Sequence, residues 1–255
     1  MSWGTATVSA REHLSGDNYR IVLHAPDIAR TAVPGQFVEV ATGGATLLNK
    51  PISIAAVGRA AGTISLVYKV VGPGTRAINA YAVGDRIGLI GPCGTGFTLN
   101  EPRACIVGGG IGIPPLLFLA AEYHQRTHFT CVLGARTAAD LVLLDEFEEL
   151  TGTAPMCATD DGSRGHHGLV VDCLKEAWQQ GPIAVYACGP VAMLKCISAL
   201  CVEAGVPCFV CLEAYMGCGI GVCMGCVIPT VRGMERVCAE GPVFAGADIL
   251  WDEVR

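Results

Sequence analysis

Short apolar runs alternate with turn residues through the first hundred positions of the chain. Runs of this length, rich in β-branched and aromatic residues and evenly spaced, are typical of strands in a small antiparallel barrel. The sequence therefore predicts an N-terminal antiparallel barrel. The predicted strands are residues 5–10, 18–24, 37–41, 52–57, 63–70 and 86–90.

From residue 103 the pattern changes to strand, loop and helix in repeated order. This alternation predicts a doubly wound parallel sheet, so the fold class is α/β plus a β-barrel. The junction falls at residues 99–102, where polar residues and a proline separate the two patterns. The predicted strands are 104–107, 129–133, 156–159, 183–187 and 208–212, and the predicted helices are 114–125, 144–150, 169–180 and 191–203.

Composition narrows the classes of partner. The 255 residues are 16% charged and 51% hydrophobic, with a formal net charge of -6 and no basic blocks, so we expect no nucleic-acid partner. The richest apolar stretch, residues 111–121, contains two prolines and is shorter than the roughly 20 residues of a membrane span. The first 20 residues lack the apolar segment of a secretory signal. We therefore expect no membrane partner and a cytoplasmic location.

Fourteen cysteines are present, but a chain of this length can build a core without disulfides. We expect reduced thiols. Ten of these cysteines lie mainly in apolar segments, where a free cysteine packs as a small hydrophobic residue. The ten are Cys93, Cys105, Cys131, Cys157, Cys173, Cys188, Cys196, Cys201, Cys208 and Cys211.

The remaining four cysteines follow the spacing C-x4-C-x2-C-x11-C, which is similar to that of a 2Fe-2S site. Glycines between the first three allow a short loop to turn several thiolates toward one centre. Zinc is the alternative, but it usually takes two C-x2-C pairs and only one is present. The pattern favours a 2Fe-2S cluster. Its predicted ligands are Cys218, Cys223, Cys226 and Cys238.

Two glycine turns follow predicted strands and open predicted helices. A turn in this position can hold a pyrophosphate with backbone N–H groups and the helix dipole. Both turns should lie at the carboxyl edge of the sheet, which favours a ligand crevice there. The first lacks the usual G-x-G-x-x-G pattern, and a purely structural turn is the alternative. The candidate residues are Gly108, Gly109, Gly110 and Gly112 in the first turn, and Cys188, Gly189 and Pro190 in the second.

Together with these motifs, Pro34-Gly35-Gln36-Phe37 and Lys50-Pro51-Ile52-Ser53 give the chain a pattern that resembles the ferredoxin reductase superfamily over nearly its whole length. Within it, residues 212–226 and the ending Gly241-Pro242-Val243-Phe244 resemble the electron-transfer subunits of class 1B dihydroorotate dehydrogenase. The resemblance implies FAD, NAD and a 2Fe-2S cluster as cofactors. It also implies three units, namely an FAD-binding barrel at 1–100, an NAD-binding domain at 101–213 and a cluster-binding segment at 214–255.

The resemblance also implies a flavin site. Lys50, Pro51, Ile52 and Ser53 would lie against the isoalloxazine and phosphates, and Val67, Tyr68 and Lys69 would flank the flavin. Gly74 and Thr75 would hold the pyrophosphate just before a predicted helical turn at residues 76–81. The family usually has arginine at the position of Lys50, and lysine lacks the two-pronged grip of arginine on a phosphate.

The function implied is electron transfer between NAD and a separate FMN-containing catalytic subunit, in a heterotetramer of two plus two, during pyrimidine synthesis. No acid or base for dihydroorotate oxidation is identified on this chain. An NAD(P)H reductase that serves ferredoxin, polysulfide or a hydrogenase-like partner is the alternative, and a zinc-stapled binding module is a third hypothesis.

The sequence leaves the roles of four further polar residues open. Arg136 either meets a 2'-phosphate or is solvated, so the choice between NAD and NADP rests on the family alone. Glu213 either lies near the flavin or nicotinamide or is a surface carboxylate. His166 and His167 are interpreted as part of a polar loop.

Overall fold

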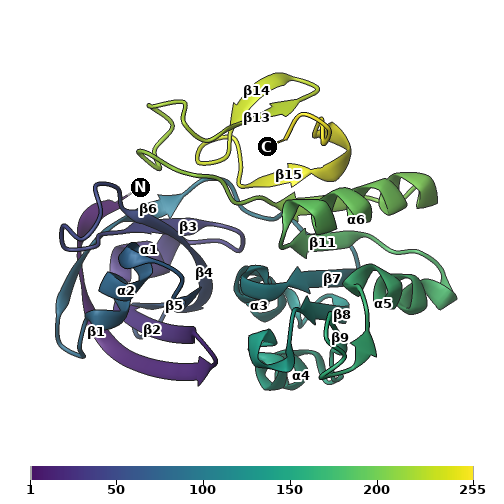
Figure 1. Ribbon diagram of the computed structural model, residues 1–255, viewed down its shortest axis with the longest axis horizontal. Coiled ribbons are helices and arrows are strands. Elements are labelled where there is room, and N and C mark those ends of the chain that lie inside the picture. Colours follow the sequence, from purple (N-terminus) through teal and green to yellow (C-terminus); the bar gives the residue numbers. More distant parts are fainter. Residues whose placement is uncertain (1, 255) are drawn as a thin grey trace.

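The computed structural model describes residues 2–254, apart from the side chains of Ser2 and Gln180. A barrel and an α/β sheet lie side by side, and the C-terminal segment covers the top of both (Figure 1). Helix α3 lies between the sheet and the barrel and contacts strand β4.

The N-terminal unit is a closed six-stranded barrel with strand order β1-β2-β5-β4-β3-β6. All its strand pairs are antiparallel, which confirms the predicted barrel. Side chains alternate across each strand, so Val38 and Val40 fill the interior while their neighbours face outward. The elements are β1 Ser2–Ser15, β2 Asn18–His24, α1 Pro26–Thr31, β3 Phe37–Val40, β4 Lys50–Gly58, β5 Thr63–Lys69, α2 Pro73–Ala80 and β6 Arg86–Cys93.

The second unit is a sheet with strand order β10-β9-β8-β7-β11-β12-β15. Strands β7 to β12 pair in parallel, as the alternating pattern predicts. Adjacent residues of β7 face opposite layers, with Ile106 toward α3 and α4 and Val107 toward α5 and α6. The elements are β7 Arg103–Gly109, η1 Gly110–Gly112, α3 Ile113–Tyr123, β8 His128–Ala135, η2 Ala138–Asp140, α4 Leu144–Thr151, β9 Met156–Thr159, β10 His166–His167, α5 Val170–Ala177, η3 Trp178–Gln180, β11 Val185–Cys188, α6 Val191–Ala204 and β12 Cys208–Cys211.

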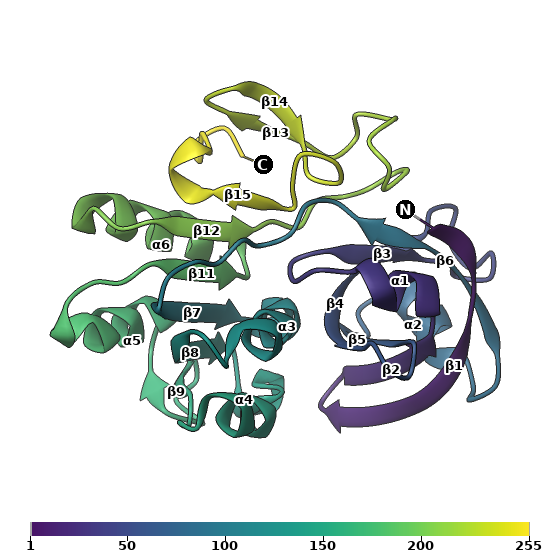
Figure 2. The ribbon, with the colours of Figure 1, turned by 180° about the vertical axis from the view of Figure 1, so that it is seen from behind.

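The C-terminal segment leaves β12, crosses toward the barrel, and returns to the sheet (Figure 2). A hairpin of β13 and β14 stands above the sheet, and β15 then pairs antiparallel with β12 at the sheet edge. The segment thereby lies against both units and forms one roof over their junction. Its elements are β13 Val227–Thr230, β14 Gly233–Arg236, β15 Val243–Ala245 and η4 Gly246–Asp248.

The structure differs from the sequence prediction at short elements. Helix α1 and strands β10, β13, β14 and β15 were not predicted. Pro26 at the first helical position, followed by Asp27, is a start signal that could have indicated α1. The prediction that Gly74 and Thr75 precede their helix is wrong, because α2 begins at Pro73 and both residues lie in its first turn.

Candidate electron-transfer site

A cavity of about 1040 Å³ lies where the barrel, the sheet and the C-terminal segment meet. Strands β4 and β5 form its barrel wall, and Ile111 and Val191 come from the loops that open α3 and α6. The linker of residues 212–216 and Cys226 form the roof side. Motifs from all three parts of the sequence therefore border one space.

The barrel wall contains most residues of the predicted flavin motif. Lys50, Pro51, Ile52, Ser53, Val67, Tyr68, Lys69 and Thr75 all line the cavity. Gly74 does not, because it is buried beneath the aliphatic part of Lys50. A Cβ atom at position 74 would collide with Lys50 Cε, so glycine permits the lysine to lie over the first turn of α2.

Two polar groups of this wall already have protein partners. The Thr75 hydroxyl accepts hydrogen bonds from the backbone N–H groups of Val71 and Gly72, at 3.0 and 3.2 Å. Lys69 Nζ lies 2.5 Å from Oδ1 of Asp140, the last residue of η2 in the sheet unit. Burial opposes ionisation of Asp140, but the hydrogen bonds from Lys69 and Asn18 and the nearby positive charges together outweigh it and lower the pKa of Asp140. The barrel wall has two lysines, Lys50 and Lys69. Unlike Lys69, Lys50 has no carboxylate oxygen within 4 Å among residues 2–254.

The two glycine turns meet at the carboxyl edge of the sheet, as expected from their places after strands. A Cβ atom at Gly112 would lie 2.5 Å from the carbonyl oxygen of Cys188, and one at Gly109 would lie 2.6 Å from Met193 Sδ. The backbone contact at Gly112 requires glycine, whereas the contact at Gly109 is with the end of a flexible side chain. Gly110 instead has a φ of +54° with open space beside its Cα, so its backbone faces outward. Ile111 and Val191, which neighbour these turns, line the cavity, but the seven candidate residues of the turns themselves do not.

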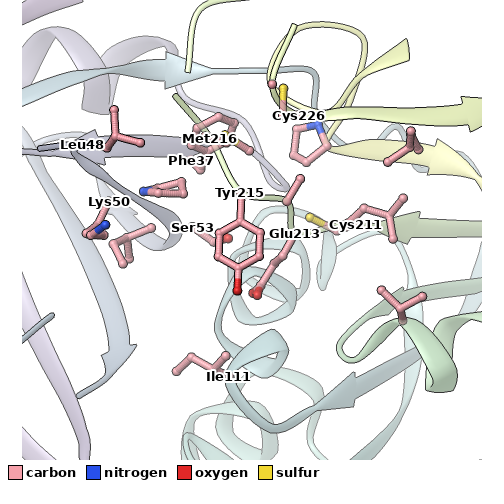
Figure 3. Close-up of a pocket in the computed structure, with 18 of the residues that line it drawn as sticks. Phe37, Leu48, Lys50, Ser53, Ile111, Cys211, Glu213, Tyr215, Met216 and Cys226 are labelled. Atoms are coloured by element: carbon pink, nitrogen blue, oxygen red, sulfur yellow. The ribbon is translucent and has the colours of Figure 1, made fainter. Parts of the chain in front are cut away.

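The linker places two side chains inside the cavity. In Figure 3, Tyr215 and Glu213 project between the barrel residues Lys50 and Ser53 and the loop residue Ile111. The Tyr215 side chain is 99% exposed, although it stands at the centre of this space. Surrounding protein atoms raise the pKa of the Glu213 carboxyl through desolvation. Glu213 is thus a cavity residue rather than an outer-surface carboxylate.

The four cysteines of the C-terminal run form two neighbouring pairs. The Cys223 N–H donates to Cys218 Sγ, and the Cys238 N–H donates to Cys226 Sγ, both at 3.4 Å. A further bond of 3.1 Å from Gly221 N–H to Cys238 Sγ ties the pairs together. Cys226 and Cys238 are buried, whereas Cys223 is exposed. Hereafter the cysteine loop means residues 217–226.

Backbone N–H groups in this loop stabilise the ionised form of a cysteine. Partial burial opposes ionisation of Cys218, but N–H groups of Ile220, Cys223 and Val222 lower the pKa of the thiol to about 6. Within residues 2–254, no three histidine, cysteine, aspartate or glutamate side chains converge on one possible metal-ion position. Two pairs of thiols instead suit a centre with two irons, in which each iron takes two thiolates. The donor set therefore fits a 2Fe-2S cluster.

The other singled-out residues lie away from the cavity. Arg136, His166 and His167 are exposed and do not line it. His166 Nε2 lies 3.6 Å from Asp172 Oδ2, and the His167 ring packs beside Gly162. Of the ten cysteines expected to be structural, eight are buried, Cys157 is partly buried and Cys196 is exposed.

Two residues of this region were missed by the sequence prediction. Tyr215 is an aromatic residue beside the cysteine run, and that position was the available signal. Glu39 is a charged strand residue of a kind that is ordinarily exposed to solvent, yet it is only 3% exposed. Burial and the nearby Cys218 raise the pKa of Glu39 to about 7, while Lys50 opposes this. No local pattern marks a buried carboxylate of this kind.

None of the helices within residues 2–254 combines the length and the apolar character that crossing a bilayer requires.

Residues 213–250 match the iron-sulfur cluster binding domain of dihydroorotate dehydrogenase B, and residues 106–199 match the oxidoreductase NAD-binding domain. The chain is 39% identical to the dihydroorotate dehydrogenase B (NAD(+)) electron transfer subunit of Desulforamulus reducens, over 97% of this chain and 98% of that protein. The subunit of the same name from Fusobacterium nucleatum is 33% identical, over 95% and 96% of the two chains.

Solved structures share the fold. One from a study of the NADH-dependent reduced ferredoxin-NADP oxidoreductase superposes with a TM-score of 0.88 at 30% identity, covering 98% of this chain and 91% of that chain. The ferredoxin reductase of carbazole 1,9a-dioxygenase gives a TM-score of 0.66 at 23% identity, covering 81% and 67%. The second likeness concerns the fold alone.

Proposed function

Because the chain belongs to the electron-transfer subunits of dihydroorotate dehydrogenase B, we propose that it carries electrons from a catalytic partner subunit to NAD+. The overall reaction is dihydroorotate plus NAD+ giving orotate, NADH and a proton, a step of pyrimidine synthesis. The observation that supports this most strongly is the cavity bordered by the flavin motif, by Ile111 and Val191 beside the two glycine turns, and by Cys226. FAD, a 2Fe-2S cluster and NAD are the cofactors.

The barrel wall is the proposed FAD site. Lys50 supplies charge for the pyrophosphate, the backbone N–H of Thr75 adds a donor, and Ser53 meets the ring edge. Gly74 contributes by leaving room for the aliphatic part of Lys50 over the first turn of α2. Pro51, Ile52, Val67, Tyr68 and Lys69 complete the wall. FAD held by this wall would supply hydride exchange with NAD and single-electron exchange with the cluster. The chain itself orients the rings and excludes water.

The two glycine turns are the proposed nicotinamide site. Gly108, Gly109, Gly110 and Gly112 bring backbone N–H groups to the pyrophosphate, while Cys188, Gly189 and Pro190 border the nicotinamide. The Glu213 carboxyl, whose pKa is raised by desolvation, lies beside this end of the cavity. Cys218, Cys223 and Cys226 of the cysteine loop, together with Cys238 after β14, would hold the cluster on the roof side.

Lys50→Met is expected to raise the dissociation constant for FAD about 10- to 100-fold, because a charge-assisted hydrogen bond to phosphate contributes about 1.5–3 kcal/mol. Flavin fluorescence during titration of the apoprotein measures the change. Lys175→Met, which removes an exposed lysine from α5, is the control and should leave FAD affinity unchanged. Equal affinity in wild type and Lys50→Met would contradict the assigned phosphate contact.

The cysteine loop is also the proposed docking surface for an FMN-containing catalytic subunit, in a heterotetramer of two plus two. Its apolar residues Ile220, Val222 and Met224 are 42%, 74% and 52% exposed. Exposed apolar groups gathered in this way are typical of protein interfaces. Cys223 is exposed between them, so docking here brings the partner close to the cluster.

Val222→Asp is expected to weaken association with the catalytic subunit at least about 10-fold, because a charge would be desolvated in the interface. Only the backbone N–H of Val222 bonds to Cys218, so the cluster should be retained. Sedimentation or size-exclusion chromatography with the partner measures the effect. Val202→Asp, at a 63% exposed position on α6, should associate normally, and a wild-type affinity for Val222→Asp would place the interface elsewhere.

A second candidate function is reduction of a ferredoxin-like partner with NAD(P)H. The 0.88 TM-score to a structure from the study of the NADH-dependent reduced ferredoxin-NADP oxidoreductase favours it. The two functions differ in the partner that docks at the cysteine loop. Electron transfer with a ferredoxin, and none with a dihydroorotate-oxidising subunit, would support the second.

A further inference from the structure

Glu39 occupies an unusual place on the barrel. It lies on β3 between Val38 and Val40, which point into the barrel core, so Glu39 and Phe37 point outward. The C-terminal segment covers this outer face, and Phe37 packs in the same apolar cluster as Cys226 and Cys238. Glu39 is therefore only 3% exposed, although it lies on the outside of a barrel.

The carboxyl of Glu39 is also unsatisfied. Its Oε1 atom is buried and has no hydrogen-bond partner among residues 2–254. Burying a carboxyl without a partner costs folding free energy, and a native protein that keeps such a group commonly uses it. The wall that contains Glu39 thus includes a polar atom that packing alone does not explain.

The cysteine loop lies directly on this carboxyl. Gly219 follows Cys218 with a φ of +67°, and a Cβ atom there would collide with Glu39 Cγ and lie 2.6 Å from Glu39 Oε1. The first turn of the loop is therefore seated on Glu39 and requires glycine. Glu39 also interacts electrostatically with Cys218 and with Cys93. Cys93 is a buried thiol that packs in the same apolar core cluster as Phe37.

The other side of Glu39 belongs to the flavin wall. Its cross-strand partner on β4 is Pro51, which lines the cavity, and Lys50 is near enough to act on its charge. Glu39 therefore lies between the proposed FAD site and the cysteine loop. A charge in that place acts on both centres.

We propose that Glu39 is a positioning residue for electron transfer, which seats the first turn of the cysteine loop and places negative potential beside the cluster. The inference rests on the proposed function, because it requires a cluster held by the loop. Reduction adds negative charge to the cluster, so a neighbouring carboxylate disfavours the reduced form and lowers the midpoint potential.

Glu39→Gln tests this with little change in shape. A redox titration of the holoprotein at about pH 8, followed by the electron paramagnetic resonance of the reduced cluster, should show a higher cluster midpoint potential than in wild type. Iron content, FAD content and flavin reduction by NADH should stay unchanged. Glu203→Gln removes one charge from an exposed position on α6 and should leave the potential unchanged.

Glu39→Asp separates charge from packing. It keeps the carboxylate and should stay closer to the wild-type potential than Glu39→Gln. If the glutamine variant loses its cluster, a potential near that of wild type in Glu39→Asp supports the inference, and a clearly raised potential in Glu39→Asp overturns it. A wild-type potential in cluster-containing Glu39→Gln, or an equal rise in both variants, would overturn the inference. Absence of a cluster from the wild-type chain would instead overturn the proposed function, so the two failures are distinguishable.

Discussion

Cys223→Ser is expected to remove the 2Fe-2S cluster and to lower electron transfer with the catalytic partner by at least about 100-fold. A serine hydroxyl does not ionise near neutral pH as a thiol does, so it is a poor iron ligand. Cys223 is exposed, which means that its replacement leaves the core intact. The glycine turns and the barrel wall lie on other elements, so NADH should still reduce bound FAD.

Iron analysis, the spectrum of the reduced cluster and the bleaching of flavin by NADH measure these effects separately. Cys196→Ser is the matched control, because Cys196 is also an exposed cysteine but lies on α6 outside the loop. It should behave as wild type in all three assays. Loss of flavin reduction in Cys223→Ser would contradict the proposed order, in which NADH passes electrons directly to FAD and the cluster lies on the other side of FAD.

Gly110→Val is expected to weaken NAD binding at least about 10-fold while FAD content stays normal. Gly110 has a φ of +54°, a conformation that β-branched residues disfavour, and its Cα faces open space at the proposed pyrophosphate site. Valine would shift the turn and occupy that space. Isothermal titration with NAD on the FAD-loaded protein measures the affinity.

Gly152→Val separates backbone strain from ligand contact. Gly152 ends α4 with a φ of +71°, and no atom lies within 4 Å of the position where its Cβ would be. Its replacement should cost similar stability, but NAD affinity should stay unchanged. An unchanged affinity in Gly110→Val would move the nicotinamide site away from this turn.

Periodicity predicted the architecture because it follows from local chain geometry. Alternation in the first hundred residues and the repeated strand-helix order led to the barrel and the parallel sheet, and both are confirmed. The meeting of the glycine turns was also predictable, because Gly112 follows β7 and Cys188 ends β11, and the carboxyl ends of such parallel strands share one edge.

Long-range contacts were not predictable from the sequence. Lys69 was expected to flank the flavin, yet Asp140 from the other unit pairs with it. Glu39 was not singled out, yet Gly219, far along the chain, covers it. Both outcomes depend on how the C-terminal segment and the sheet unit lie against the barrel, and no local pattern encodes that arrangement. The roles of individual site residues stay predictions for the same reason.

The most direct test of the proposed function is anaerobic NADH formation from dihydroorotate and NAD+. The FAD- and iron-loaded chain would be assayed alone and with the FMN-containing catalytic subunit from the same source. We predict turnover only when both subunits are present. An inactive mixture, in which the chain still oxidises NADH with an artificial acceptor, would contradict the role in dihydroorotate oxidation and point to a different partner for the same flavin site.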